Sequence, residues 1–332
     1  MTVITTRKFV YSPAPKRVVA IVNPFSGAGG GRRVLRLLRD YPWSARVTAF
    51  ETEPGSLNAH HAAIEHALQT DAERLIVSGG DGTLMETLTA LRQRGVSIPI
   101  CMIPTGTGNI VANDLATPRR IYPAIKQAFN PGILRWWDAG LLPDQNLVFA
   151  LRASAGFEAM ALTTIKSAAK HRWGVVAYAV PALREFLRTR PVTYTLTIDD
   201  RPPIQLEGVV AFTAVTSRMA GGVNFVISRD IRPDDGVLHV GVFHPRKILQ
   251  NLPAMLNQAA LQARDMISVF PVQHRVTIES SVPQVTQVDG EILGTTPLYV
   301  ETLPQYAAFI TPLMPRGRLL PRAYRQRLAQ LY

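Results

Sequence analysis

Cysteine is almost absent from this chain, because Cys101 is the single one among 332 residues. A disulfide within the chain needs two cysteines, so this count excludes it, and it also excludes a cluster of thiolate metal ligands. Cys101 stands inside the apolar stretch Ile98 to Ile103. We therefore expect it to be a small core residue.

Long apolar runs are also missing. No stretch of 18 or more apolar residues occurs, so the pattern predicts no membrane-spanning helix. The first apolar run, Val18 to Val22, leads directly into Asn23 and Pro24 rather than into a signal-peptide cleavage site. We expect an intracellular, cytoplasmic protein.

Acidic residues are few relative to basic ones. The chain has 36 Lys and Arg against 24 Asp and Glu, a formal net charge of +12, while 47% of its residues are hydrophobic. This composition is typical of a globular protein with an anionic partner: nucleic acid, anionic lipid or a phosphorylated substrate. The basic residues are spread out without a recognised nucleic-acid-binding module, so we expect no nucleic acid. The length favours two domains.

The first 140 residues alternate apolar runs with helical spacing, which predicts a Rossmann-like parallel sheet with helices on both faces. We expect both faces of its strands to be buried. The predicted strands are Val18 to Val22, Ala45 to Phe50, Leu75 to Val77 and Ile98 to Ile103, and the predicted helices are Arg32 to Arg39, Ser56 to Gln69 and Leu84 to Arg94. Open sheets of this kind bind ligands at the loops that follow their strands.

Period-two alternation replaces this pattern after about Asp138. It occurs at Pro191 to Asp200, Val237 to Phe243 and His274 to Glu279, and it predicts an antiparallel β domain. Helical insertions are expected at Ala159 to Arg190 and near Pro245 to Ala263. The fold class is therefore α/β plus all-β.

The loop between the third predicted strand and the third predicted helix reads Gly79, Gly80, Asp81, Gly82, Thr83. Glycines let the backbone approach an anion, and a helix start offers free N–H groups, so the loop is suited to a phosphate chain. Asp81 adds a carboxylate for a metal ion or a proton transfer. Neither a Walker loop nor a dinucleotide G-x-G-x-x-G pattern is present.

Two more loops follow predicted strands. The first runs from Asn23 through Pro24, Phe25 and Ser26 to Gly27, and the second, Pro104 to Asn109, carries Thr107 between two glycines. Hydroxyl, amide and backbone donors of this kind suit phosphate or ribose contacts. A surface turn with a helix start is the alternative for each loop taken singly.

Two acidic turns lie in the second half. In Asp289-Gly290-Glu291 two carboxylates are placed to act at one site, where one of them can serve as a general base. The turn from Arg232 through Asp235 to Val237 can bind a hard cation through a carboxylate and backbone carbonyls. A hairpin turn with solvated acids is the alternative for both.

The order of these motifs resembles the bacterial soluble diacylglycerol kinase and lipid kinase family, relatives of sphingosine and ceramide kinases. The resemblance implies that residues 1–140 bind ATP with Mg²⁺, that residues 141–305 form an antiparallel β-sandwich that supplies the lipid site, and that residues 306–332 pack back on the first domain. The nucleotide contacts it implies are Asn23, Pro24, Phe25, Ser26, Gly27, Thr52, Gly79, Gly80, Asp81, Gly82, Thr83, Leu84, Met85, Glu86, Thr107, Asn109 and Asp138.

The same resemblance assigns roles to the acids. Asp81 organises the phosphates and magnesium, with Asp138 supporting that network, and either Asp289 or Glu291 is the base. Carbonyls of Arg232 and Val237 with the carboxylate of Asp235 form a structural magnesium site. This chain departs from many relatives at Asn109-Ile110-Val111-Ala112, where an acid usually follows the asparagine.

The activity implied is transfer of the γ-phosphate of ATP to a lipid hydroxyl, first of all that of diacylglycerol, to give phosphatidic acid. Other lipid alcohols, NAD as acceptor, and a catalytically silent lipid- or nucleotide-binding protein remain alternatives. We expect peripheral membrane contact and leave a homodimer open. Two basic segments with interspersed apolar residues could rest on anionic lipid, or be solvated: Lys166 to Arg190 and Arg316 to Arg327.

Overall fold

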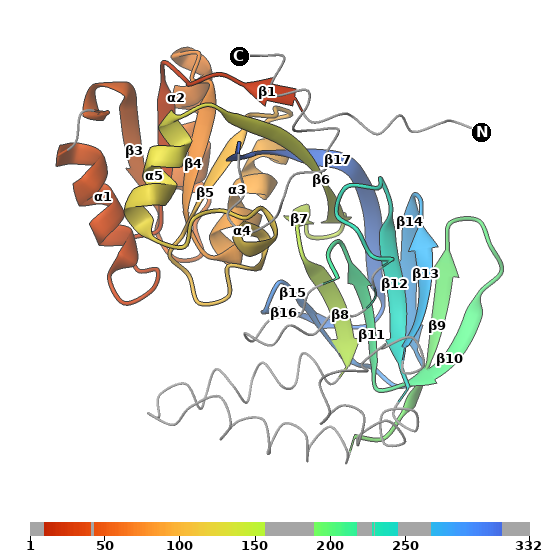
Figure 1. The fold of residues 1–332 in the computed structure, drawn as a ribbon. Coiled ribbons are helices and arrows are strands. Elements are labelled where there is room, and N and C mark those ends of the chain that lie inside the picture. Colours follow the sequence, from red (N-terminus) through yellow and green to blue (C-terminus); the bar gives the residue numbers. More distant parts are fainter. Residues whose placement is uncertain are drawn as a thin grey trace, which may run out of the picture. The chain divides into compact units, whose positions relative to one another are not determined.

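The computed structural model describes residues 10–40, 43–156, 189–217, 228, 230–244 and 267–313. The chain divides into two compact units. Of the described residues, those up to Trp136 and those from Ala307 onward form the N-terminal unit, and those from Trp137 to Tyr306 form the C-terminal unit. The boundaries between the units fall inside strands β6 (Gly132–Leu142) and β17 (Leu298–Pro312). The chain therefore runs from one unit to the other along these two strands (Figure 1).

A parallel sheet forms the centre of the N-terminal unit, as the apolar runs predict. Its strand order is β17-β5-β4-β2-β3, with β2 at Val18–Val22, β3 at Val47–Glu51, β4 at Arg74–Gly79 and β5 at Ile100–Pro104. Each of these neighbours pairs in parallel. The short β1 (Val10–Ser12) pairs antiparallel with the start of β6. The carboxyl ends of β2, β4 and β5 therefore meet at one edge of the sheet.

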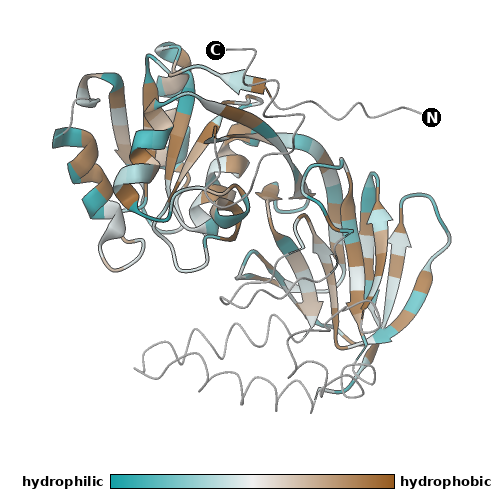
Figure 2. Cartoon of the chain, viewed as in Figure 1, coloured by the Kyte–Doolittle hydropathy of each residue, from teal (hydrophilic) through white to brown (hydrophobic). Residues whose placement is uncertain are grey.

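Helices cover both faces of this sheet. Helices α1 (Gly30–Asp40) and α5 (Ile121–Phe129) share one core cluster with alternate residues of β2. Helices α2 (Asn58–Gln69) and α3 (Asp81–Gln93) pack together and against β2, β3 and β4. The turn η1 (Ser44–Arg46) precedes β3, and the short α4 (Ile110–Asp114) follows β5. Hydrophobic residues are concentrated in the central strands (Figure 2).

Two details differ from the sequence predictions. Strand β3 was expected to be buried on both faces, yet none of its residues is buried. It is the edge of the parallel sheet and pairs only with β2, so neighbouring strands and helices cover it less than the central strands. Helices α4 and α5 were not predicted, and α4 has only five residues, too few to show a periodic pattern.

Cys101 is buried in the core cluster, as predicted, and burial raises the pKa of its thiol to about 11. The neighbouring Arg74 is also buried, and its guanidinium donates to the carbonyl oxygens of Ala128 and Asn130. Burying this charge is tolerated because its donors are satisfied.

Antiparallel strands build the C-terminal unit, which confirms the predicted all-β part. One sheet has the strand order β13-β12-β11-β8-β15-β16. The other strands of the unit have the order β10-β9-β14-β17. The last residues of β6 pair with β7. Their bounds are β7 Leu147–Phe149, β8 Arg152–Gly156, β9 Val192–Ile198, β10 Ile204–Gly208, β11 Val210–Ala214, β12 Leu238–Phe243, β13 Ile267–Val272, β14 Arg275–Ser280, β15 Val285–Val288 and β16 Glu291–Thr295.

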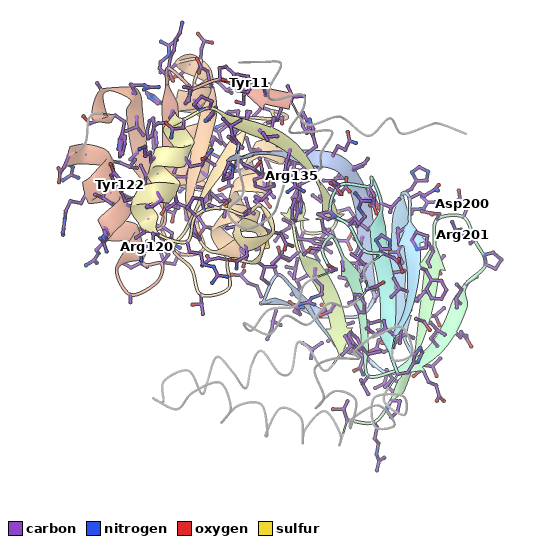
Figure 3. All side chains as sticks on the ribbon, in the orientation of Figure 1. Tyr11, Arg120, Tyr122, Arg135, Asp200 and Arg201 are labelled. Atoms are coloured by element: carbon purple, nitrogen blue, oxygen red, sulfur yellow. The ribbon has the colours of Figure 1, made fainter. Side chains whose placement is uncertain are left out.

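The period-two pattern of β9 corresponds to alternating burial, with Tyr194, Leu196 and Ile198 in the core. Asp200 and Arg201 mark the turn between β9 and β10 (Figure 3). The predicted helical insertions lie outside the described residues, apart from Thr189 and Arg190, and the basic segment from Arg316 also lies outside them. None of the described helices has the length and apolar character that crossing a membrane requires.

Candidate functional site

Main-chain hydrogen bonds join the loops that follow β2 and β5 to the last two residues of β4, Ser78 and Gly79. Asn23 donates its backbone N–H to the carbonyl of Ser78 over 2.9 Å, and Thr105 and Gly106 donate theirs to the carbonyl of Gly79 over 3.1 and 3.2 Å. The glycine- and hydroxyl-rich loops singled out in the sequence are therefore neighbours at one edge of the sheet. Such an edge is where open α/β sheets bind ligands.

Hydroxyl groups order the first of these loops. The Ser26 hydroxyl donates its single proton to the carbonyl of Asn23 over 2.8 Å. In its contact of 2.7 Å with the Thr105 hydroxyl it can therefore only accept, and Thr105 is the donor. Asn23 Oδ1 accepts the N–H of Phe25 over 2.9 Å. Gly31 packs on this turn so closely that a Cβ would lie 1.9 Å from the Asn23 carbonyl oxygen. Within this loop Pro24 is buried, while Gly27 and Phe25 are exposed.

Helix α3 begins at Asp81, three residues earlier than the sequence pattern predicts. Gly80 caps it with extended backbone, and Leu84 donates the first helical N–H to the Gly80 carbonyl. Asp81, Gly82 and Thr83 are thus the first turn of the helix, where N–H groups lack partners within the helix and the dipole favours an anion. The pattern missed this start because Gly and Asp are poor helix formers.

Asp81 joins two helices. Its carboxylate accepts the N–H of Ile110 over 3.1 Å and that of Val111 over 3.2 Å, which caps the start of α4. Burial raises the pKa of Asp81, and these N–H groups partly offset the rise. Each carboxylate oxygen keeps a further lone pair for a cation. Asp81 therefore positions the third loop in addition to any role toward a phosphate.

The third loop is closed by Asn109, which has left-handed backbone with φ of 50°. Its side chain accepts the N–H of Gly106 over 3.0 Å and donates to the Gly106 carbonyl over 2.6 Å. A Cβ on Gly106 would lie 2.4 Å from the Cα of Gly80, so this close approach of the second and third loops requires glycine. Thr107, between them, is exposed.

Three other predicted nucleotide contacts are buried. Thr52 is 3% exposed and donates its N–H to the carbonyl of Val22, which places it beside the end of β2. The side chains of Leu84 and Met85 belong to the core, so only their backbone atoms can contact a nucleotide.

Glu86 is partly exposed on α3, and its Oε2 lies 3.2 Å from Nε2 of the buried His60. His60 was missed in the sequence. A single histidine on a helix, 26 positions from its partner, gives no pattern that would identify it.

In the C-terminal unit Asp138 is fully buried and connects the turn from Arg232 to Val237 with strand β17. Its carboxylate accepts the N–H of Gly236 over 2.8 Å and that of Gln305 over 2.7 Å. Its own N–H bonds to the carbonyl of Pro233. Burial raises the pKa of Asp138 to about 6, and the negative charges of Asp235 and Asp234 add to the rise.

The turn from Arg232 to Val237 holds the residues expected to bind magnesium. Asp235 accepts the N–H of Val237 over 3.3 Å, and burial, followed by the charge of Asp234, raises the pKa of Asp235. A cation here would relieve this crowding of negative charge, and a carboxylate with carbonyl oxygens is a donor set that suits Mg²⁺. In the part of the chain that the structure describes, no three His, Cys, Asp or Glu side chains form a metal cluster. The carbonyls of Arg232 and Val237 would therefore have to supply much of the coordination.

The two acids of the Asp289-Gly290-Glu291 turn differ in their environment. Asp289 accepts the N–H of Ala150 over 3.2 Å and that of Arg152 over 2.8 Å, and its own N–H bonds to the Arg152 carbonyl. Glu291 is exposed at the start of β16. The turn thus combines one carboxylate that fixes the backbone with one that is accessible to a substrate.

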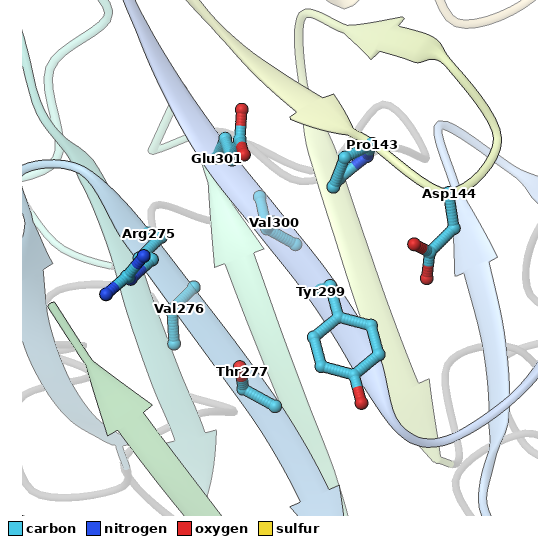
Figure 4. A pocket seen from close by; sticks show the side chains of 8 residues that line it. All are labelled: Pro143, Asp144, Arg275, Val276, Thr277, Tyr299, Val300 and Glu301. Carbon is cyan, nitrogen blue, oxygen red and sulfur yellow. The ribbon is translucent and has the colours of Figure 1, made fainter.

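A separate pocket of about 270 Å³ lies on the C-terminal unit (Figure 4). It is lined by Pro143, Asp144, Arg275, Val276, Thr277, Tyr299, Val300 and Glu301. None of the site residues predicted from the sequence lines this pocket.

Comparison with known proteins assigns both parts of the chain. Residues 17–136 match the diacylglycerol kinase catalytic domain, and residues 152–311 match the YegS C-terminal NAD kinase beta sandwich-like domain. A diacylglycerol kinase of Mycobacterium tuberculosis is 24% identical over 89% of this chain and 95% of its own. A protein named as a probable YegS-like lipid kinase, of Klebsiella pneumoniae, is 27% identical over 73% of this chain and 78% of its own.

The fold has a counterpart among solved structures. The crystal structure of a diacylglycerol kinase from Bacillus anthracis has a TM-score of 0.64 and 19% identity, and the match covers 90% of this chain and 97% of that one. The two matched domains together span most of the sequence. This chain therefore belongs to the diacylglycerol kinase and YegS-like lipid kinase family.

Proposed function

We propose that this protein transfers the γ-phosphate of ATP to the hydroxyl of diacylglycerol and so produces phosphatidic acid. The observation that carries the proposal is the meeting of three loops rich in glycine and hydroxyl groups at one sheet edge, where α3 begins. Such an edge suits the triphosphate of a nucleotide. The kinase family supports ATP as phosphate donor, and the relative named diacylglycerol kinase supports the acceptor.

In this proposal the loops bind and orient ATP through backbone N–H groups and the exposed hydroxyl of Thr107, while the hydroxyls of Ser26 and Thr83 order the loops. Phosphoryl transfer is in-line and depends mainly on positioning and charge neutralisation, so no covalent enzyme intermediate is needed. Asp81 is proposed to organise the phosphates and their cation, and Asp138 to support that network through the backbone that it fixes. Magnesium, when bound, neutralises charge on the phosphate oxygens.

Glu291 is the proposed base that takes the proton of the lipid hydroxyl. Its carboxylate is exposed, whereas both oxygens of Asp289 accept backbone N–H groups. Hydrogen bonds to a carboxylate lower its basicity, which also favours Glu291. Asp289 then positions the turn that carries the base, while Arg232, Asp235 and Val237 would hold a structural Mg²⁺.

Peripheral contact with an anionic membrane is the proposed route to the lipid, for a cytoplasmic protein that does not bind nucleic acid. It predicts salt-sensitive binding to anionic vesicles. Binding that is unchanged after both basic segments are neutralised contradicts it. A homodimer is part of the same proposal, and light scattering of the purified protein tests it.

A screen with radiolabelled ATP tests the function. Diacylglycerol, sphingoid bases, ceramide, glycerophospholipids and NAD are offered in parallel to the wild type, Glu291→Gln and Glu279→Gln, an exposed acid on β14 that serves as the matched control. We expect labelled phosphatidic acid from the wild type and from Glu279→Gln only. Labelled NADP, or ATP binding without any transfer, rejects the proposal in favour of an NAD kinase or a silent protein.

A further inference from the structure

Gln287 is a buried residue near the end of β15 to which no role has been assigned. It stands two positions before Asp289, in the strand that leads into the acidic turn, and it is 2% exposed. Strand β15 lies between β8 and β16 (Figure 1). A buried amide needs partners for its polar atoms, so the contacts of Gln287 show what it holds in place.

The turn that follows Gln287 has left-handed backbone. Asp289 has a φ of 44° and Gly290 a φ of 98°, and Val288 pairs with Glu291 across the turn, as in a two-residue hairpin. The hydrogen bond of such a turn joins its first and fourth residues, so it does not use the N–H of Gly290, the third residue. That N–H needs an acceptor from outside the turn.

The side chain of Gln287 bridges this turn to β8. The N–H of Gly290 can only donate, so the atom that accepts it over 2.9 Å is Oε1 of Gln287. The other end of the amide, Nε2, donates to Oγ of Ser154 over 2.6 Å. Ser154 is completely buried and lies directly opposite Gln287, in a strand that pairs on both sides. The amide therefore ties the third residue of the turn to the interior of a sheet.

A separate contact holds the second residue of the turn. The carboxylate of Asp289 accepts the N–H groups of Ala150 and Arg152, at the start of β8. The pairing of β15 with β16 is irregular between Thr286 and Gln287, a distortion of the kind that changes the direction of side chains. Two side chains, one for each central residue, thus fix the backbone of the turn.

We propose that Gln287 is a positioning residue for Glu291, which it performs by holding the turn against Ser154. The inference rests on the proposed function in one respect, that Glu291 takes the proton of the lipid hydroxyl. Glu291 directly follows Gly290, so the direction of its side chain depends on the backbone that Gln287 fixes. A displacement of about 1 Å at a reacting group can lower a rate by about 10²-fold.

Hydrogen exchange of the Gly290 N–H in the free protein tests the bridge. Gln287→Met keeps the length of the side chain and removes both hydrogen-bonding groups. In this variant we expect the Gly290 N–H to exchange about tenfold faster, the loss expected for one hydrogen bond. Equal exchange rates in the wild type and in Gln287→Met overturn the proposal. This measurement needs neither lipid nor nucleotide.

Gln284→Met is the matched control. Gln284 lies just before β15, and its Nε2 donates to the nearby carbonyls of Val282 and Pro283, both over 3.2 Å. These contacts stay within four consecutive residues and do not reach the acidic turn. Its replacement should leave the exchange of Gly290 and the turnover number unchanged.

Steady-state kinetics with diacylglycerol and radiolabelled ATP test the positioning role. Gln287→Met should lower kcat by about 10- to 100-fold and leave the KM for ATP unchanged. In a Glu291→Gln background the same change should have little further effect on the residual rate, because Gln287 acts through Glu291. A wild-type kcat in Gln287→Met overturns the proposal. The same fall in both backgrounds also overturns it, because Gln287 would then only support the fold.

Ser154→Ala is a second variant, and it replaces Gln287→Met if that protein does not fold. It removes the partner of Nε2 and leaves Gly290 its acceptor, so kcat should fall less than in Gln287→Met and the Gly290 N–H should exchange only slightly faster. Wild-type kcat and exchange in Ser154→Ala overturn the proposal. A wild type that phosphorylates no lipid rejects the proposed function, and the exchange measurement still decides whether Gln287 holds the turn.

Discussion

The two acids of the Asp289-Gly290-Glu291 turn should separate stability from activity when they are replaced singly. Asp289→Ala removes the acceptor of two backbone N–H groups, those of Ala150 and Arg152, and both of these residues are at least nine-tenths buried. A hydrogen bond to a charged group contributes about 1.5–3 kcal/mol, and partial exposure of Asp289 reduces this. We expect a loss of about 2–4 kcal/mol in unfolding free energy.

Glu291→Gln should have the opposite profile. Its side chain is exposed, so the unfolding free energy should change by less than about 0.5 kcal/mol. Loss of a general base lowers kcat by roughly 10²–10⁴-fold. The variant should therefore fold as the wild type does and be nearly inactive.

Urea unfolding followed by fluorescence measures the first quantity, and phosphorylation of diacylglycerol in mixed micelles measures the second. For a unit of this size, 2–4 kcal/mol corresponds to a fall in Tm of roughly 4–16 °C, which gives a second readout. Glu279→Gln controls for the loss of an exposed negative charge. Full activity in Glu291→Gln, or an Asp289→Ala protein as stable as the wild type, would refute the reasoning.

Three further predictions follow from single contacts. Gly31→Ala should lower the free energy of unfolding by about 1–3 kcal/mol or more and abolish ATP binding, because the new Cβ would lie 1.9 Å from the Asn23 carbonyl oxygen. Gly82→Ala is the control and should keep the stability of the wild type, because nothing lies within 4 Å of its new Cβ. Equal Tm values for the two variants would contradict this. The pKa of Asp138 is raised in the folded state to about 6, so its contribution to the unfolding free energy is full below about pH 4 and falls by about 3 kcal/mol as the pH rises through 6. Urea unfolding of the wild type and of Asp138→Asn from pH 4 to 7 tests this. The difference in stability between the two proteins should change by that amount, and a constant difference would contradict the prediction. Removal of Mg²⁺ with a chelator should lower the Tm of the wild type but not that of Asp235→Asn, and a Tm independent of Mg²⁺ argues against a cation at this turn.

Apolar runs and turn residues were sufficient to predict most of the fold. Val18 to Val22 and Leu75 to Val77 are buried central strands, as continuous apolar runs indicate, and the alternation in Pro191 to Asp200 corresponds to β9. The prediction that both faces of each strand are buried was wrong for β3, because the position of a strand in its sheet decides its burial. Strand β3 lies at the edge of its sheet, and none of its residues is buried.

The loops of the candidate site could be located from the sequence because their backbone conformation and close packing require glycine, asparagine and hydroxyl residues. Asn109 adopts left-handed backbone, and Gly31 packs without a side chain against the Asn23 carbonyl. Other features depend on long-range contacts. The capping of α4 by Asp81 spans 29 and 30 positions, and no local pattern predicts it.

The sequence by itself determined the fold class, the order of the motifs and the residue types at the loops, since these depend on periodicity and on backbone conformations that few residues adopt. Only the tertiary structure decided which contacts each acid makes. Asp289 and Glu291 are equivalent candidates in sequence, but main-chain donors 137 and 139 positions away engage Asp289 and leave Glu291 accessible. The approach of His60 Nε2 to Glu86 Oε2, at 3.2 Å, was decided in the same way, because burial and contacts between helices are properties of the packed chain.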